Sequence, residues 1–210
     1  LGHERALANG MTLRGVLEII TDFRRDNTHT PVIMMGYANP IERFGYDAFA
    51  DASSVAGVDG LITVDLPPEE VGRLDHALIQ VGIDNIFLIS PTTEKERIET
   101  IVARARGFIY YVAVKGVTGS GQLDVNEVAQ RVGVIRGMTD LPVAVGFGIK
   151  DADTASHVAQ VADAVVVGSA LIDEMVRKSR ADASLEEIQI HEAAVQLLKR
   201  IRSGVDSSPS

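Results

Sequence analysis

The stretch Leu141–Ser169 decides the fold, and it reads LPVAVGFGIK DADTASHVAQ VADAVVVGS. Two short apolar runs, Val143–Val145 and Ala164–Val167, flank a helical pattern of residues. Small residues follow each run, Gly146-Phe147-Gly148 after the first and Gly168-Ser169 after the second. Strand, helix and strand in this order predict a βαβ unit with glycine at the carboxyl end of both strands.

The glycines at these strand ends fit the binding of an anion. Backbone N–H groups that no side chain covers can approach an anion closely, and the N-terminus of the following helix adds partial positive charge. In (β/α)8 barrels, the loops after the seventh and eighth strands often form a phosphate site. Two tight strand-to-helix turns without any ligand would produce the same pattern, so both interpretations stay open at this point.

Strands alternate with helices along the rest of the chain. The wholly apolar run Pro31–Met35 predicts a parallel strand that is buried on both faces, and a helix is predicted at Ile41–Ala56. Three further strands are predicted at Val58–Val64, Asn85–Ile89 and Phe108–Val114. Alternation this regular implies a parallel sheet.

Two parallel architectures compete, an open doubly wound sheet and a (β/α)8 barrel. The fingerprint of dinucleotide-binding sheets, G-x-G-x-x-G, follows the first strand, whereas Gly146-Phe147-Gly148 follows the fifth predicted strand and lacks the third glycine. A barrel has eight strands and roughly 250 residues. The 210 residues here therefore predict an α/β protein of the (β/α)8 TIM-barrel class, with six of the eight strands visible and the first two βα units absent.

The predicted domain organisation is simple. Residues 1–202 are assigned to a single barrel domain that lacks its N-terminal part, and its last helix is predicted at Leu185–Arg202. Residues 203–210 are polar and are predicted to form a disordered tail. The chain opens on Leu1 rather than on methionine, which agrees with the expected missing part.

Composition argues against several classes of function. The chain has a net charge of −9 and no cysteine, which excludes a disulfide framework, a zinc–thiolate site and a thiol nucleophile. Its basic clusters are pairs such as Arg24-Arg25 and Lys199-Arg200, which argues against nucleic-acid binding. No apolar run approaches the ~20 residues that span a membrane, and no signal peptide is visible, so we expect no membrane association and a cytoplasmic location.

The five histidines show no spacing typical of metal ligands. They fall on predicted helices or loops, and neither H-x-x-x-H nor H-E-x-x-H occurs. We therefore predict no metal site. The residues are His3, His29, His76, His157 and His191.

Six stretches of the chain, in order and in register, resemble the α subunit of tryptophan synthase. They are Pro31–Pro40 (PVIMMGYANP), Gly57–Glu70 (GVDGLITVDLPPEE), Phe87–Thr92 (FLISPT), Tyr110–Gly119 (YYVAVKGVTG), Val145–Ile149 (VGFGI) and Val167–Ala170 (VGSA). The resemblance implies a (β/α)8 barrel that cleaves indole-3-glycerol phosphate to indole and glyceraldehyde 3-phosphate in tryptophan biosynthesis. It also implies a partner, the pyridoxal-phosphate-dependent β subunit of an αββα heterotetramer, and no cofactor in this chain.

Retro-aldol cleavage needs carboxylates near the substrate, because the leaving indole carbon must gain a proton and the glycerol hydroxyl must lose one. The resemblance implies one catalytic Glu at the end of the second strand and one catalytic Asp in the loop after it. Both would lie before Leu1. We therefore expect no catalytic residue of this kind in the chain, and no activity from the chain alone.

Asp65 is the visible carboxylate that could assist proton transfer, since it ends a strand on the face where barrel enzymes place catalytic residues. It could equally fix its loop or contact the partner, because two prolines follow it. Asp59 begins a strand and is interpreted as structural. Glu69 and Glu70 are interpreted as the exposed first turn of a helix.

The resemblance also implies binding residues. The indole pocket would be lined by Tyr37, Ile62, Leu88, Tyr110 and Phe147, and the phosphate would be held by Gly119, Gly148, Ile149, Gly168 and Ser169. Ordinary barrel core would explain the apolar members equally well. The Ser169 hydroxyl and backbone N–H groups would hold the phosphate without Lys or Arg. Thr118 matches the threonine of a lid loop that contacts the catalytic Asp, and Lys115 is either a charge from that lid or a solvated lysine.

Two other functions stay open. A non-catalytic phosphate-binding or regulatory fragment could bind ligands and activate the β subunit without the two carboxylates. A different phosphate-binding barrel, such as a thiamin-phosphate-synthase-like or isomerase-like enzyme, would share Leu141–Ser169. It need not contain Tyr37-Ala38-Asn39-Pro40 or the loop Gly116–Gly119.

Overall fold

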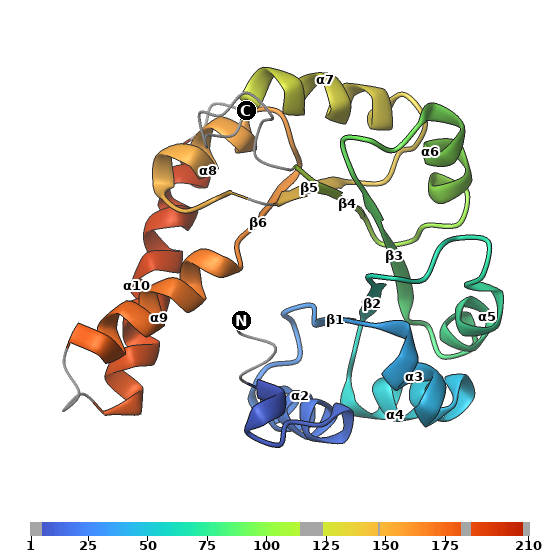
Figure 1. Cartoon of the computed structure of the whole chain (residues 1–210), viewed down its shortest axis with the longest axis horizontal. Coiled ribbons are helices and arrows are strands. Elements are labelled where there is room, and N and C mark those ends of the chain that lie inside the picture. The colour runs from blue at the N-terminus through green and yellow to red at the C-terminus, as the bar shows by residue number, and fades with distance from the viewer. Residues whose placement is uncertain (1–5, 114–123, 147, 182–185, 208–210) are drawn as a thin grey trace. The chain divides into compact units, whose positions relative to one another are not determined.

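The computed structural model of the chain describes residues 6–113, 124–146, 148–181 and 186–207. Helices and strands alternate along these residues (Figure 1). The strands are β1 (Ile33–Gly36), β2 (Gly60–Thr63), β3 (Asp84–Ile89), β4 (Ile109–Val112), β5 (Val143–Gly146) and β6 (Ala164–Val166). The helices are α2 (Leu13–Asp26), α3 (Ala38–Phe44), α4 (Tyr46–Ala56), α5 (Gly72–Gln80), α6 (Lys95–Val102), α7 (Val125–Arg136), α8 (Ala152–Ala159), α9 (Ser169–Ala181) and α10 (Glu187–Asp206). Each predicted strand is present.

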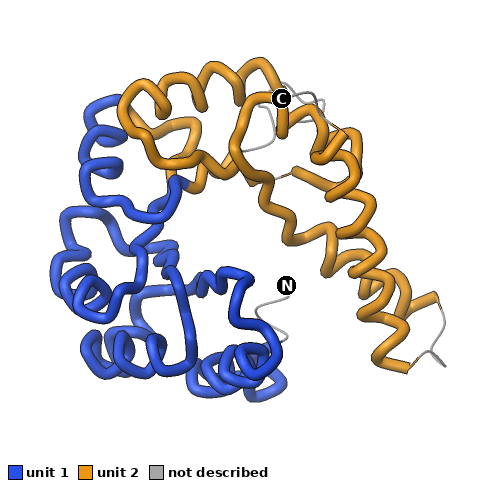
Figure 2. Tube along the Cα trace, turned by 180° about the vertical axis from the view of Figure 1, so that it is seen from behind, with its two compact units in different colours: residues 1–88, 95–109 blue, residues 89–94, 110–210 orange. Residues whose placement is uncertain are grey.

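The chain forms two compact units, which Figure 2 draws in different colours. Unit 1 comprises Leu1–Leu88 and Lys95–Ile109, and unit 2 comprises Ile89–Glu94 and Tyr110–Ser210. The short segment Ile89–Glu94 thus belongs to unit 2, although the residues that flank it in the sequence belong to unit 1. The assignment of residues 1–202 to one domain stays a prediction.

In unit 1, β1, β2 and β3 follow one another in the sheet and run parallel. Residues paired across the strands share a face of the sheet. Met35 pairs with Ile62, and Ile62 pairs with Ile86, so these three residues lie on one face. Met34 pairs with Leu61 on the other face, which is the face that α2 and α4 cover.

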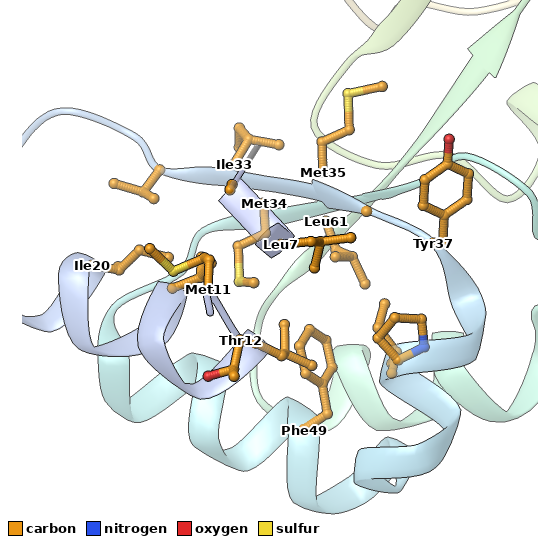
Figure 3. Close-up of a pocket in the computed structure, with 17 residues that line it drawn as sticks. Leu7, Met11, Thr12, Ile20, Ile33, Met34, Met35, Tyr37, Phe49 and Leu61 are labelled. Carbon is orange, nitrogen blue, oxygen red and sulfur yellow. The ribbon is translucent and has the colours of Figure 1, made fainter. Parts of the chain in front are cut away.

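An apolar cavity of about 520 Å³ lies between β1 and the helices α2, α3 and α4. Figure 3 shows Met34 and Phe49 pointing into this cavity, whereas Met35 projects from the opposite side of β1. Met35 is 57% exposed, so the prediction that Pro31–Met35 is buried on both faces is wrong. β1 ends the strand order of the described sheet, and helices cover only the face that carries Met34.

Arg24, in α2, connects the segments that lead into β1 and β2. Its guanidinium donates hydrogen bonds to the carbonyl groups of Gly57 at 2.8 Å and Thr30 at 2.7 Å, and it pairs with the Asp59 carboxylate. Asp59 also accepts a hydrogen bond from the Val32 N–H at 2.7 Å. The predicted structural role of Asp59 is therefore confirmed.

The single helix predicted at Ile41–Ala56 is in fact two helices, α3 and α4. Gly45 separates them with a φ of +90°, a backbone conformation that glycine adopts without the steric cost other residues incur. The continuous apolar periodicity concealed this break, because both helices bury residues, Ile41 in α3 and Phe49 in α4.

The turn before α5 also differs from the prediction. The helix begins at Gly72, so Glu69 and Glu70 do not form its first turn. The Glu70 N–H instead donates to the Pro67 carbonyl at 3.0 Å. Glu69 forms an ion pair with Arg97 at 2.9 Å, and this contact ties the turn to α6.

In unit 2, α10 packs against α8 and α9. An ideal Cβ on Gly204 would lie 2.3 Å from the carbonyl oxygen of Ala152, so the backbones of α10 and α8 approach closely. α10 continues to Asp206, and the predicted helix end at Arg202 with a disordered tail from residue 203 is wrong. The close contact at Gly204 and an ion pair between Arg202 and Asp206 at 2.8 Å stabilise this last turn.

Gly204→Ala tests the contact between α10 and α8. The new Cβ would overlap the Ala152 carbonyl, and overpacking of this kind lowers the free energy of unfolding by about 1–3 kcal/mol. Gly133→Ala in α7 is the control, because nothing lies within 4 Å of a Cβ there and alanine favours a helix by ~1 kcal/mol over glycine. Chemical denaturation should show G204A less stable and G133A more stable than the wild type. A G204A protein as stable as the wild type would contradict the contact.

Candidate functional site

Three predicted indole-pocket residues lie in unit 1 on the sheet face that the helices leave uncovered. Ile62 shares this face with its paired residues Met35 and Ile86. Leu88 comes two residues after Ile86 in β3 and falls on the same face. Tyr37 follows the end of β1, and Figure 3 shows its ring on the same side of β1 as Met35. Parallel pairing thus brings buried Ile62, half-buried Leu88 and exposed Tyr37 onto one face.

Asp65 follows β2, and its carboxylate fixes the neighbouring loop. Its Oδ1 accepts a hydrogen bond of 2.7 Å from the N–H of Ala38, the first residue of α3. A carboxylate at this point satisfies a backbone donor that the helix leaves open, and the positive end of the helix dipole favours it. This contact supports the loop-fixing interpretation of Asp65 over a role in proton transfer.

Tyr110 lies in unit 2, on β4, against the backbone of β5. An ideal Cβ on Gly146 would lie 2.4 Å from the Tyr110 hydroxyl oxygen and 2.6 Å from its Cε2. Burial raises the pKa of the Tyr110 phenol above its usual value. The sequence indicated Gly146 only as a glycine at a strand end, and its role in making room for an aromatic ring was missed. That role depends on a residue of another strand.

Gly146→Ala should displace the Tyr110 ring. We expect a loss of about 1–3 kcal/mol in the free energy of unfolding, because the added methyl group overpacks a filled site. The loss should be smaller when Tyr110 is first replaced by leucine, which leaves room for the methyl group. Denaturation of the wild type, both single variants and the double variant measures this coupling. Additive losses would show that Gly146 and Tyr110 do not meet.

The predicted phosphate residues of unit 2 follow β5 and β6. Gly146 and Val166 are the last paired residues of these strands, and Gly148 and Gly168 each come two residues later. Gly148 has a φ of +89°, which favours glycine. Ile149 is buried and anchors its loop in the core, whereas Gly168 is exposed.

The two helices that follow these loops differ in charge at their N-termini. Asp151 caps α8 by accepting a hydrogen bond of 2.8 Å from the Thr154 N–H, and hydrogen bonds from the Thr154 side chain and backbone hold the pKa of Asp151 below its usual value. α9 begins at the exposed residue Ser169 and has no acidic residue in its first turn. The positive end of α9 is therefore the one that its own sequence does not neutralise.

Other predicted positions lie outside the described residues, and these are Lys115, Thr118, Gly119 and Phe147. Within the described ranges, no group of three or more His, Asp or Glu side chains could hold a metal ion. No helix in this part of the chain has the length and apolar character needed to cross a membrane.

Known proteins resemble this chain in sequence and in structure. Residues 1–201 match the family described as tryptophan synthase alpha chain. The tryptophan synthase alpha chain of Bordetella parapertussis is 50% identical over 204 residues, which are 97% of this chain and 72% of that relative. The crystal structure of the tryptophan synthase alpha chain from Legionella pneumophila subsp. pneumophila is 40% identical, with a TM-score of 0.86 over 99% of this chain and 74% of that chain. A structure of the tryptophan synthase a2b2 complex from Pyrococcus furiosus is 32% identical, with a TM-score of 0.81 over 97% of this chain and 78% of that chain.

These matches and the parallel strands place the chain among the α/β proteins of TIM-barrel type. The chain belongs to the tryptophan synthase alpha chain family. The predicted fold class is therefore confirmed. The open dinucleotide-binding sheet and the other phosphate-binding barrels drop out as alternatives.

Proposed function

We propose that this chain binds indole-3-glycerol phosphate and serves its retro-aldol cleavage to indole and glyceraldehyde 3-phosphate, a lyase reaction of cytoplasmic tryptophan biosynthesis. The observation that carries the proposal is the N-terminus of α9 at Ser169, where small exposed residues meet a helix end with no acidic side chain. A phosphate group satisfies such an end. Tyr110, in the same unit, offers an aromatic surface for an indole ring, and membership of the family supports the substrate.

The carboxylates at the ends of the described strands are already engaged. Asp65 binds the Ala38 N–H, and Asp59 pairs with Arg24. The resemblance places the catalytic Glu and Asp before Leu1. We therefore propose that the 210-residue chain binds the substrate but does not cleave it alone. The contact of Asp65 also favours a second candidate, a non-catalytic phosphate-binding subunit that activates its partner.

The proposed partner is a pyridoxal-phosphate-dependent β subunit that receives the indole. The relative from Pyrococcus furiosus was solved as an a2b2 complex and is described in terms of mutual activation. Its likeness to this chain supports the same kind of assembly here. In that assembly, pyridoxal phosphate belongs to the β subunit, and this chain contributes the site for the phosphate ester.

Ser169→Asp tests the anion site at α9. A carboxylate at the start of the helix should stabilise the helix dipole by roughly 0.3–1 kcal/mol and repel a phosphate group. We expect the Tm without ligand to be unchanged or higher, and inorganic phosphate no longer to raise it. Ser179→Asp adds the same charge at an exposed position near the other end of α9 and should keep the phosphate-dependent shift. A wild-type shift in S169D would contradict the site.

Indole release tests the catalytic statement. The chain contains no tryptophan, so indole fluorescence reports the product directly. We expect no indole from indole-3-glycerol phosphate with the chain alone, because the proton-transferring carboxylates of the resemblance are not among its residues. Stimulation of the β subunit without indole release would support the second candidate. Indole release that Asp65→Asn abolishes would instead give Asp65 the proton-transfer role.

A further inference from the structure

The loop after β3 is a compact turn closed by its own side chains. The Ser90 N–H donates to the Thr93 hydroxyl oxygen at 3.0 Å, and the Thr93 N–H donates to the Ser90 carbonyl at 3.1 Å. The hydroxyl groups of Ser90 and Thr92 lie 3.0 Å apart. These bonds define the shape of the turn, and its carbonyl groups are available to a donor from elsewhere in the chain.

Arg131, in α7, is that donor. Its Nη2 donates to the carbonyl groups of Pro91 and, at 3.2 Å, Thr93. Hydrogen bonds from a charged donor are stronger than those between neutral groups. All of these residues belong to unit 2. The contact with Arg131 is the physical reason why Ile89–Glu94 belongs to that unit.

Tyr111 fixes the guanidinium from the other side. Its ring is buried, with 1% exposure, and it lies in β4 directly after Tyr110. Burial raises the pKa of the Tyr111 phenol, while the charge and hydrogen bond of Arg131 lower it and the charge of Glu127 raises it. Arg131 is thus held between a buried phenol and the turn, and its orientation is set by both.

We propose that Arg131 is a positioning residue for the ligand site, because it holds the turn Ser90–Thr93 at the carboxyl end of β3. It acts through that turn and does not touch the ligand. The turn directly follows Leu88, and the Tyr111 that orients Arg131 adjoins Tyr110. The inference rests on the proposed function, since it takes Tyr110 and Leu88 as the residues that meet the indole ring.

The first test reads the order of the turn. Arg131→Met removes both hydrogen bonds, and Arg131→Lys keeps the charge. Arg136→Met is the control, because Arg136 lies in the same helix and pairs at 2.8 Å with Asp163, which precedes β6. Hydrogen exchange over residues 88–97 should be faster in R131M, intermediate in R131K and unchanged in R136M. Wild-type exchange in R131M would overturn the proposal.

The second test separates positioning from general stability. Indole is titrated by its own fluorescence, and inorganic phosphate by its effect on the Tm. Indole should bind R131M about tenfold more weakly, as expected for the loss of hydrogen bonds from a charged donor. R131K should recover part of this affinity. Phosphate should bind within about twofold of the wild type, because the distant α9 site is unchanged, and R136M should keep both affinities.

Equal weakening of both ligands in R131M, together with a lower Tm, would overturn the proposal and give Arg131 a purely structural role. If the wild type binds neither ligand, the proposed function fails. The exchange data then decide alone, and faster exchange confined to the turn in R131M still supports Arg131 as the residue that orders it.

Discussion

Parallel pairing of the strands is the constraint on which the rest of the structure depends. Paired residues share a face, and successive residues alternate between faces. In unit 1 this rule places Met35 and Ile62 together and turns Met34 toward the helices. In unit 2 it separates two neighbours in the sequence, because Tyr110 meets the backbone of β5 and Tyr111 lies beside α7. One strand thereby serves a candidate ligand surface and the core.

The placement of charge decides which strand ends can receive an anion. Asp151 neutralises the start of α8, and Asp65 occupies the N–H that opens α3. Arg24 neutralises Asp59 in turn. The start of α9 at Ser169 has no such acid in its first turn. Anion binding without a dedicated lysine or arginine is therefore a consequence of which helix ends the sequence caps with its own carboxylates.

Much of the fold followed from local pattern, and the failures have physical causes. Six strands and their order were predictable because apolar runs and small residues act over a few positions. The break at Gly45 was not, because apolar residues continue through both helices, and the turn at Glu69 was not, because its partner Arg97 lies in another helix. The exposure of Met35 depends on what covers β1.

The sequence by itself determined the α/β class, the glycine and serine residues at the strand ends and the resemblance to a family, because each is read from residues close together in the chain. Only the tertiary structure decided that Gly146 makes room for Tyr110 and that Arg131 holds the turn at Pro91. The atoms of each pair come from separate elements. No local pattern encodes which side chains meet once the strands pair and the helices pack on them.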